Sequence, residues 1–176
     1  TGKSKEAHPL LRQALSISRQ TGSRSEEADI LTTMGYVFTA LGRLENAANA
    51  YAQGLRLRRE LGQSNRSLEN LVGMAETARR RGRHDEAFSQ IEESLKWIER
   101  HDIADVDLLL TIYLTAYRVL TEVGQEQRAG KLLKDAYQLL QSKAAEIQSD
   151  SLRSLFLNNV AVHRDIVASW EEIQSQ

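Results

Sequence analysis

Apolar residues recur along this chain at helical spacing, and the pattern returns about every 40 residues. The clearest copy starts with four positions spaced i, i+3, i+4 and i+7, which places them on one face of a helix. They are Leu31, Met34, Gly35 and Phe38. After Leu41-Gly42, a second set at i, i+4 and i+8 marks a facing helix, namely Ala47, Tyr51 and Leu55. This pattern predicts a hairpin of two helices.

The glycine after the first helix defines an internal repeat. Equivalent glycines are separated by 40, 40 and 42 residues: Gly2, Gly42, Gly82 and Gly124. A glycine just past a helix end is favoured because positive φ costs it little. We therefore predict a repeat array over residues 1–148, followed by a C-terminal helical cap over 149–176. The array divides into a half repeat, 1–24, and three repeats, 25–64, 65–104 and 105–148.

Helix boundaries follow from the same pattern and from capping residues. We predict helices over 4–20, 24–41, 45–61, 67–81, 85–101, 106–123 and 126–147, then one from Ser149-Asp150 and a ninth, or a continuation, over 162–172. Pro9 either kinks the first helix or begins its regular part. The segment 23–26 reads as a capping box, Ser67 as a helix cap, and the segment 102–105 as a cap for the sixth helix.

Composition supports an all-α fold and narrows the chemistry. The chain has one proline, no cysteine and a formal net charge of -1. Disulfides and cysteine-ligated zinc are therefore excluded, and the lack of basic excess argues against a nucleic-acid binder. No apolar run approaches the roughly 20 residues that span a bilayer. We expect a cytoplasmic protein, and the missing initiator Met suggests a piece of a longer chain.

The hairpin pattern resembles a known family. The order Leu31-x2-Met34-Gly35-x2-Phe38, then Leu41-Gly42, then Ala47-x3-Tyr51 is similar to the tetratricopeptide repeat, and the likeness extends over about residues 1–140. The period is longer than the usual length of about 34 residues. In this it resembles arrays of bacterial regulatory ATPases and activators. The resemblance implies a right-handed α-α superhelix that acts as a non-catalytic scaffold for a protein or peptide.

In that family the first helix of each hairpin lines a concave groove, and the resemblance places ten side chains there. They are Asp29, Thr32, Tyr36, Thr39, Glu69, Glu76, Arg79, Arg80, Arg83 and Arg118. Tyr36 and the arginines are the candidate anchors, and arginine favours an acidic partner because its guanidinium binds carboxylates bidentately. The competing interpretation of the run 79–83 is a solvated helix end.

Other functions find less support in the sequence. The dipeptides His84-Asp85 and His101-Asp102 suggest a metal-dependent hydrolase, but a helix of about 25 Å would separate them, so they cannot share one ion. We predict no catalytic, cofactor-binding or metal-binding residue. A small-molecule sensor, with its ligand between hairpins, is the alternative function.

The first helix carries a second apolar stripe, formed by Leu10, Ala14 and Ile17. The next helix can cover only part of its surface. Upstream repeats or another copy of the chain would have to cover the rest, because exposed apolar faces mark interfaces. Self-association through this helix is therefore a further hypothesis.

Overall fold

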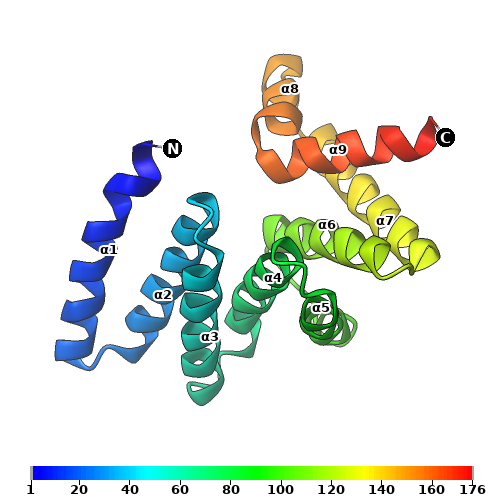
Figure 1. Ribbon diagram of the computed structural model, residues 1–176. Coiled ribbons are helices and arrows are strands. Elements are labelled where there is room, and N and C mark those ends of the chain that lie inside the picture. The colour runs from blue at the N-terminus through cyan, green and yellow to red at the C-terminus, as the bar shows by residue number, and fades with distance from the viewer. Residues whose placement is uncertain (1, 176) are drawn as a thin grey trace. The chain divides into compact units, whose positions relative to one another are not determined.

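The computed structural model describes residues 2–175, with side chains from residue 6 onward, and this part of the chain contains nine helices and no strand (Figure 1). The prediction of an all-α fold is confirmed. The helices are α1 (Gly2–Thr21), α2 (Arg24–Ala40), α3 (Leu44–Glu60), α4 (Ser64–Arg80), α5 (His84–Ile98), α6 (Val106–Glu122), α7 (Glu126–Ala145), α8 (Asp150–Asn159) and α9 (Ala161–Gln174).

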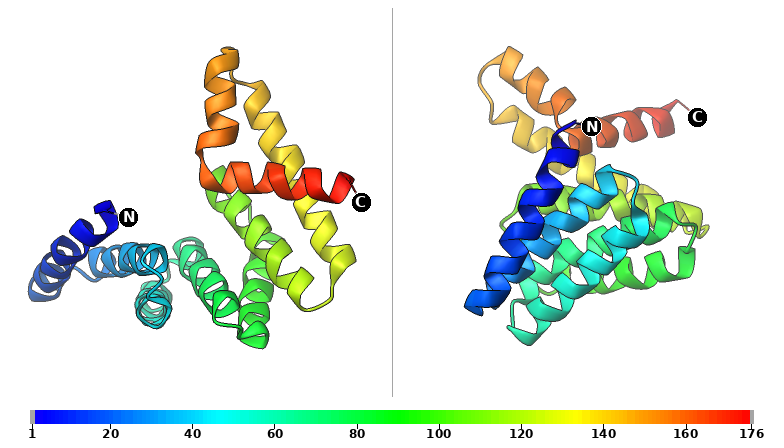
Figure 2. Two further views of the ribbon diagram at one scale, coloured as in Figure 1. Left: turned by 45° about the horizontal axis from the view of Figure 1, so that its top comes forward. Right: turned by 60° about the vertical axis from the view of Figure 1, so that its left-hand side comes forward.

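The chain divides into two compact units, residues 1–97 and 98–176. In the first unit, α1 packs on α2, α2 on α3 and α3 on α4, so that neighbours in sequence are neighbours in space. In the second unit, α6 packs on α7, and α9 contacts α6, α7 and α8 (Figure 2). Consecutive helix packing of this kind is that of a helical solenoid.

A short turn follows each of the first four helices, with two residues after α1 and three after α2, α3 and α4. Each turn contains a glycine with φ between 67° and 71°, at Gly22, Gly42, Gly62 and Gly82. The next residue donates its amide back to a carbonyl five residues earlier, as Arg43 does to Phe38 at 2.9 Å. This is the Schellman closure of a helix, which glycine favours. Because α2, α3 and α4 each have 17 residues, helices start every 20 residues. Gly2, by contrast, is the first residue of α1.

Two predicted helix boundaries were wrong by three residues, and one predicted helix cap was wrong. Helix α4 begins at Ser64, because the turn at Gly62 fixes its start, and Ser67 is a buried residue inside the helix. The Ser67 hydroxyl donates to the Gln63 carbonyl at 3.2 Å and caps nothing. Helix α5 ends at Ile98, three residues before the predicted end.

The structure shows an uninterrupted helix at Pro9, corrects one predicted capping box and confirms one predicted helix cap. Helix α1 continues through Pro9 from Gly2. Ser23 occupies the N-cap of α2 but makes no side-chain cap hydrogen bond, so the predicted capping box was wrong. Its hydroxyl instead accepts from Thr21 at 3.1 Å. The predicted cap of α6 is confirmed, because the Asp105 carboxylate accepts from the Leu108 amide at 3.0 Å.

A serine cap begins α8, and an extended residue ends it before α9. Ser149 caps α8 by accepting from the Leu152 amide at 3.4 Å. Val160 is extended, with ψ 121°, and separates α8 from α9, which settles the choice between a ninth helix and a continuation.

The core of the first unit centres on the ring of Tyr51, from α3. The ring is 1% exposed and lies against the backbones of two neighbouring helices. A Cβ atom added to Gly35 of α2 would lie 2.4 Å from the ring, and one added to Gly73 of α4 would lie 2.5 Å from it. Real Cβ atoms do not approach so closely, so only glycine allows α2 and α4 to meet this ring. Met34 and Phe38 complete the cluster.

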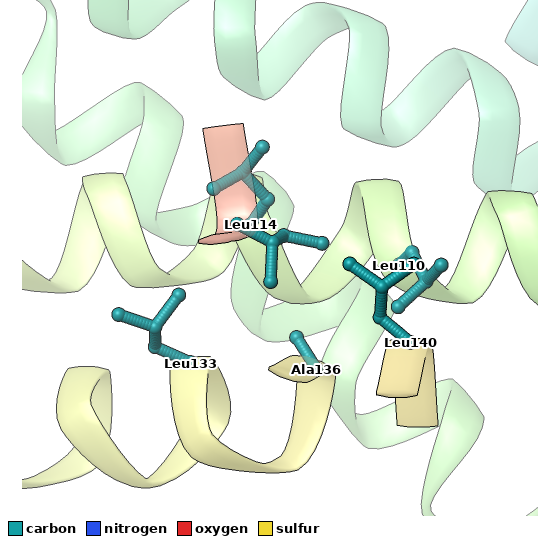
Figure 3. Packing of buried hydrophobic residues seen from close by; sticks show 6 residues of the cluster. Leu110, Leu114, Leu133, Ala136 and Leu140 are labelled. Carbon is teal, nitrogen blue, oxygen red and sulfur yellow. The ribbon is translucent and has the colours of Figure 1, made fainter. Parts of the chain in front are cut away.

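The core of the second unit lies between α6 and α7, with α9 laid across it. Leu110 and Leu114 of α6 face α7 (Figure 3). Their partners from α7 and α9 are Leu133, Ala136, Leu140 and Ile166. At the edge, Tyr137 stacks on Trp170 with ring centroids 5.2 Å apart. Helix α9 is thus held by apolar packing.

The Tyr51 packing predicts a large effect of a single methyl group. Gly35→Ala should destabilise the protein by about 1–3 kcal/mol, because overpacking forces the ring or the helices to move. Gly130→Ala is the matched control: no atom lies within 4 Å of its added Cβ, so the helix should gain about 0.5–1 kcal/mol. Urea unfolding followed by circular dichroism measures both. Equal effects at the two glycines would contradict this packing.

The two helix N-caps, Asp105 and Ser23, predict different losses of stability on substitution by alanine. Asp105→Ala should cost about 1 kcal/mol, since it removes the acceptor of the Leu108 amide. Ser23→Ala should change stability by less than about 0.5 kcal/mol, since Ser23 makes no cap hydrogen bond. Thermal unfolding of the two variants compares them directly. A larger loss for Ser23→Ala than for Asp105→Ala would show that the assignment of the caps is wrong.

Candidate binding surface

The predicted groove residues of α2 and α4 separate into a group around Tyr36 and a group that packs the helices together. The first group, called here the Tyr36 surface, comprises Tyr36 and Arg80, which are exposed, and Thr39, Glu69, Glu76 and Arg79, which are partly buried. Tyr36 is the most prominent member, because its side chain is 48% exposed. Its ring meets the buried ring of Tyr51 edge to face, with centroids 5.6 Å apart and planes at 84°. Such a contact holds an aromatic side chain in one orientation.

The hydroxyl of Tyr51 connects the core to this surface. It shares a hydrogen bond with Thr39. Burial raises the pKa of the Tyr51 phenol well above its usual value, and the nearby Tyr36, Glu76 and Glu69 raise it further, while the bond to Thr39 lowers it. The Tyr51 phenol is therefore uncharged. Through this residue α3 contacts both Thr39 and Tyr36 of the Tyr36 surface.

The charged residues of the Tyr36 surface bind one another or the backbone. Arg79 donates from Nε to Glu76 at 2.8 Å and from Nη2 at 3.1 Å, and both side chains are mostly buried. Arg80 is exposed and donates from Nη1 to the Thr39 carbonyl at 3.1 Å. Arg80 therefore ties the C-terminal turn of α2 to α4 although the residue is exposed.

The second group packs the helices together and consists of Thr32, which is buried, and Asp29, whose side chain is 44% exposed. The Thr32 hydroxyl accepts from Asn70 of α4 at 2.9 Å and donates to the Ala28 carbonyl at 2.9 Å. With 3% exposure it cannot line a groove, which corrects its predicted place. Asp29 accepts from two arginines, Arg58 of α3 and Arg66 of α4.

Arg58 and Asn70 are structural residues that sequence reasoning missed. The Arg58 side chain is only 2% exposed, and besides Asp29 it binds the Gln63 side chain. Asn70 is fully buried against Gly54, where an added Cβ would lie 2.6 Å from its amide nitrogen. A signal for Arg58 existed, because it continues the apolar stripe of Tyr51 and Leu55 at i+7. A charged residue in that register predicts a buried ion pair.

The run 79–83 does not form one anion site in the structure. Arg81 binds Glu45, and Arg83 lies 3.4 Å from Glu86 and 4.0 Å from Glu45. Arg79 and Arg80 have the separate partners described above. The arginines thus have carboxylate or carbonyl partners within the protein, and Arg81 and Arg83 share Glu45.

Arg118 belongs to the second unit, where it donates to Asp165 of α9 at 2.8 Å. That contact joins α6 to α9. His163 of α9 is also buried there, with Nδ1 donating to the Phe156 carbonyl at 2.9 Å and Nε2 3.4 Å from Asp107. Both residues stabilise the packing of α9.

The histidine-aspartate pairs lie at opposite ends of α5. His84 and Asp85 are in its first turn, and His101 and Asp102 follow its end. Within the described residues, no three histidine, aspartate or glutamate side chains come together as metal ligands would. Over the same residues, no helix combines the length and the apolar character needed to cross a membrane.

The consecutive packing of its helices places the chain in the class of helical-repeat proteins. Residues 28–61, which take in most of α2 and all of α3, match the family model of the tetratricopeptide repeat. The chain therefore contains a tetratricopeptide repeat, as the sequence pattern predicted. No curated protein matches the chain. The match covers the helices that carry Tyr36 and Tyr51.

The Asp29 network predicts a loss of stability that differs from that of an ordinary surface pair. Asp29→Ala should cost about 2 kcal/mol, because it leaves the Arg58 guanidinium buried without its carboxylate. Glu60→Ala is the matched control: it breaks a pair with Arg24 whose side chains are 50% and 45% exposed, and should cost less than about 1 kcal/mol. Denaturant titration measures both, and equal losses would count against a structural role for Asp29.

Proposed function

We propose that the Tyr36 surface binds a segment of a protein or peptide without catalysis. The observation that supports this most is the position of Tyr36. A half-exposed aromatic ring, backed by the fixed ring of Tyr51 and surrounded by polar groups, resembles the anchor residues that dominate protein interfaces. Such a ring loses little conformational entropy on binding, because packing already orients it.

The charges around Tyr36 suggest the partner's chemistry. Arg80 uses one of its five N–H donors on the Thr39 carbonyl, and its exposed guanidinium suits a carboxylate of the partner. We therefore propose that the segment carries an apolar or aromatic residue for Tyr36 and an acidic residue nearby for Arg80. Arg79 serves a different purpose, since Glu76 already neutralises it.

The resemblance to arrays of bacterial regulatory proteins supports a place for this chain in such a regulator, acting in the cytoplasm. The sensor hypothesis requires a ligand pocket between hairpins. Two hollows occur elsewhere: one lies along α1, lined by Arg12, Leu15 and Ser16 among others, and one lies at the turn before α5. Neither of these two hollows spans two hairpins, and the half-exposed ring of Tyr36 is the reason that peptide binding is preferred.

A displayed library of random 12-residue peptides tests the proposal. Peptides selected on the wild-type protein should bind Tyr36→Ala at least tenfold more weakly, since an anchor is worth about 2 kcal/mol. They should be enriched in acidic residues. Arg80→Gln should weaken binding several-fold and reduce that enrichment, because it removes the charge and leaves a shorter, uncharged polar side chain.

Gln53→Ala provides the control, because Gln53 is an exposed residue of α3 away from this surface. It should bind the selected peptides as the wild type does. Peptides that bind Tyr36→Ala and the wild type equally would overturn the proposal, provided that circular dichroism shows both variants to be folded. Selection of basic peptides would overturn the assignment of the acidic residue.

A further inference from the structure

Two contacts fix how α2 and α4 lie beside one another at the Tyr36 surface. The Thr32 hydroxyl of α2 accepts from Asn70 of α4 at 2.9 Å. Further along α2, the Thr39 carbonyl accepts from Arg80 at 3.1 Å. Residue numbers rise from the first contact to the second in both helices, so the two helices run in the same direction. Tyr36 lies between the two contacts on α2, and it is therefore level with the segment 71–79 of α4.

The side of α4 next to Tyr36 carries charges in a definite order. Four residues at i, i+4, i+7 and i+11 share this side of the helix, namely Glu69, Gly73, Glu76 and Arg80. The middle of this side is neutral, because Glu76 pairs with Arg79 at 2.8 Å. Its two ends have opposite formal charges, with Glu69 before the level of Tyr36 and Arg80 after it. At about 1.5 Å per residue, positions 69 and 80 lie about 16 Å apart along the helix.

The carboxylate of Glu69 belongs to the same environment as the aromatic rings. Burial raises the pKa of the Tyr51 phenol, and the negative charges of Glu76 and Glu69 raise it further, which places both carboxylates near the Tyr51 hydroxyl. Glu69 is partly buried, so salt screens its charge less than that of an exposed carboxylate. A carboxylate has about four acceptor sites, and contacts within the protein therefore leave sites for a cation of a partner.

We propose that the Tyr36 surface recognises a segment with opposite charges on the two sides of its apolar residue. Arg80 binds the acidic side chain, Tyr36 contacts the apolar one, and Glu69 binds a lysine or arginine on the other side. An extended segment rises about 3.3 Å per residue, so about five residues separate two charges that bind about 16 Å apart. A segment with acidic residues on both sides is rejected, because one of them meets Glu69. This specificity rests on the peptide binding proposed above, to which it adds the basic residue, the order and the spacing.

Peptides selected on the wild-type protein test the order of charges. Aligned on their apolar residue, they should be enriched in lysine or arginine on one side and in aspartate or glutamate on the other. Selection on Glu69→Gln should lose the basic enrichment and keep the acidic one, because Arg80 is intact. Peptides that depend on Tyr36 but carry no basic residue on the second side would overturn this specificity alone. If no selected peptide depends on Tyr36, the peptide-binding proposal and this specificity are both wrong.

An exchange of charge between protein and peptide tests Glu69 itself. One selected peptide is compared with a version in which glutamate replaces its basic residue, and fluorescence anisotropy gives the dissociation constants. The wild type should bind the basic version at least about fivefold more tightly, and Glu69→Lys should bind the glutamate version more tightly by a similar factor. If Glu69 has only a structural role, Glu69→Lys should weaken both versions alike, which would overturn the proposal.

Glu172→Lys is the control for net charge, because it makes the same change of charge in α9, outside the Tyr36 surface. It should keep the preference of the wild type, and a reversed preference in this variant would overturn the proposal. Should circular dichroism show that Glu69→Lys loses native helix content, Glu69→Gln replaces it. That variant should bind the two versions equally, and a fivefold preference for the basic version would then contradict the role of Glu69.

Discussion

The first unit depends on one contact, the ring of Tyr51 held between the backbones of two helices. Gly35 and Gly73 allow α2 and α4 to approach the ring to distances at which any side chain would collide with it. This contact fixes the position of α3 between its neighbours. It also determines the surface, because the Tyr51 ring orients Tyr36 and its hydroxyl binds Thr39. The candidate binding surface is thus an extension of the core.

A second set of contacts, a layer of polar side chains, joins the same three helices, α2, α3 and α4. Asp29 of α2 meets Arg58 of α3 and Arg66 of α4, and Thr32 meets Asn70. Buried ion pairs contribute little net stability but strongly penalise arrangements that separate them. We interpret this layer as one that fixes the register of the helices, while Tyr51 fixes their spacing. Tyr36 and Arg80 are the two exposed residues of the Tyr36 surface, and the proposed partner would contact both of them.

The sequence predicted what depends on local pattern. Helical periodicity located every helix, and the Leu41-Gly42 turn located the hairpin, because both follow from short-range geometry. It predicted that Gly35 is a small residue in the packing but missed Gly73, whose contact is with another helix. It grouped Arg79 with Arg83 because they are adjacent in sequence, whereas their partners, Glu76, Glu86 and Glu45, come from different parts of the fold. Glu76 and Glu86 each lie three residues from their arginine, but the contact with Glu45 joins residues far apart in sequence and cannot be deduced from spacing alone.

A double-mutant cycle between Gly73 and Tyr51 tests the central claim most directly. Gly73→Ala should destabilise the wild type by about 1–3 kcal/mol, and Tyr51→Leu should cost about 2 kcal/mol. If the ring is what the added methyl group meets, the double variant should be no less stable than Tyr51→Leu alone, a coupling of at least about 1 kcal/mol. Hydrogen exchange of the α3 amides reports these stabilities within the first unit. Additive losses would contradict the account, because the methyl group would then be clashing with something other than Tyr51.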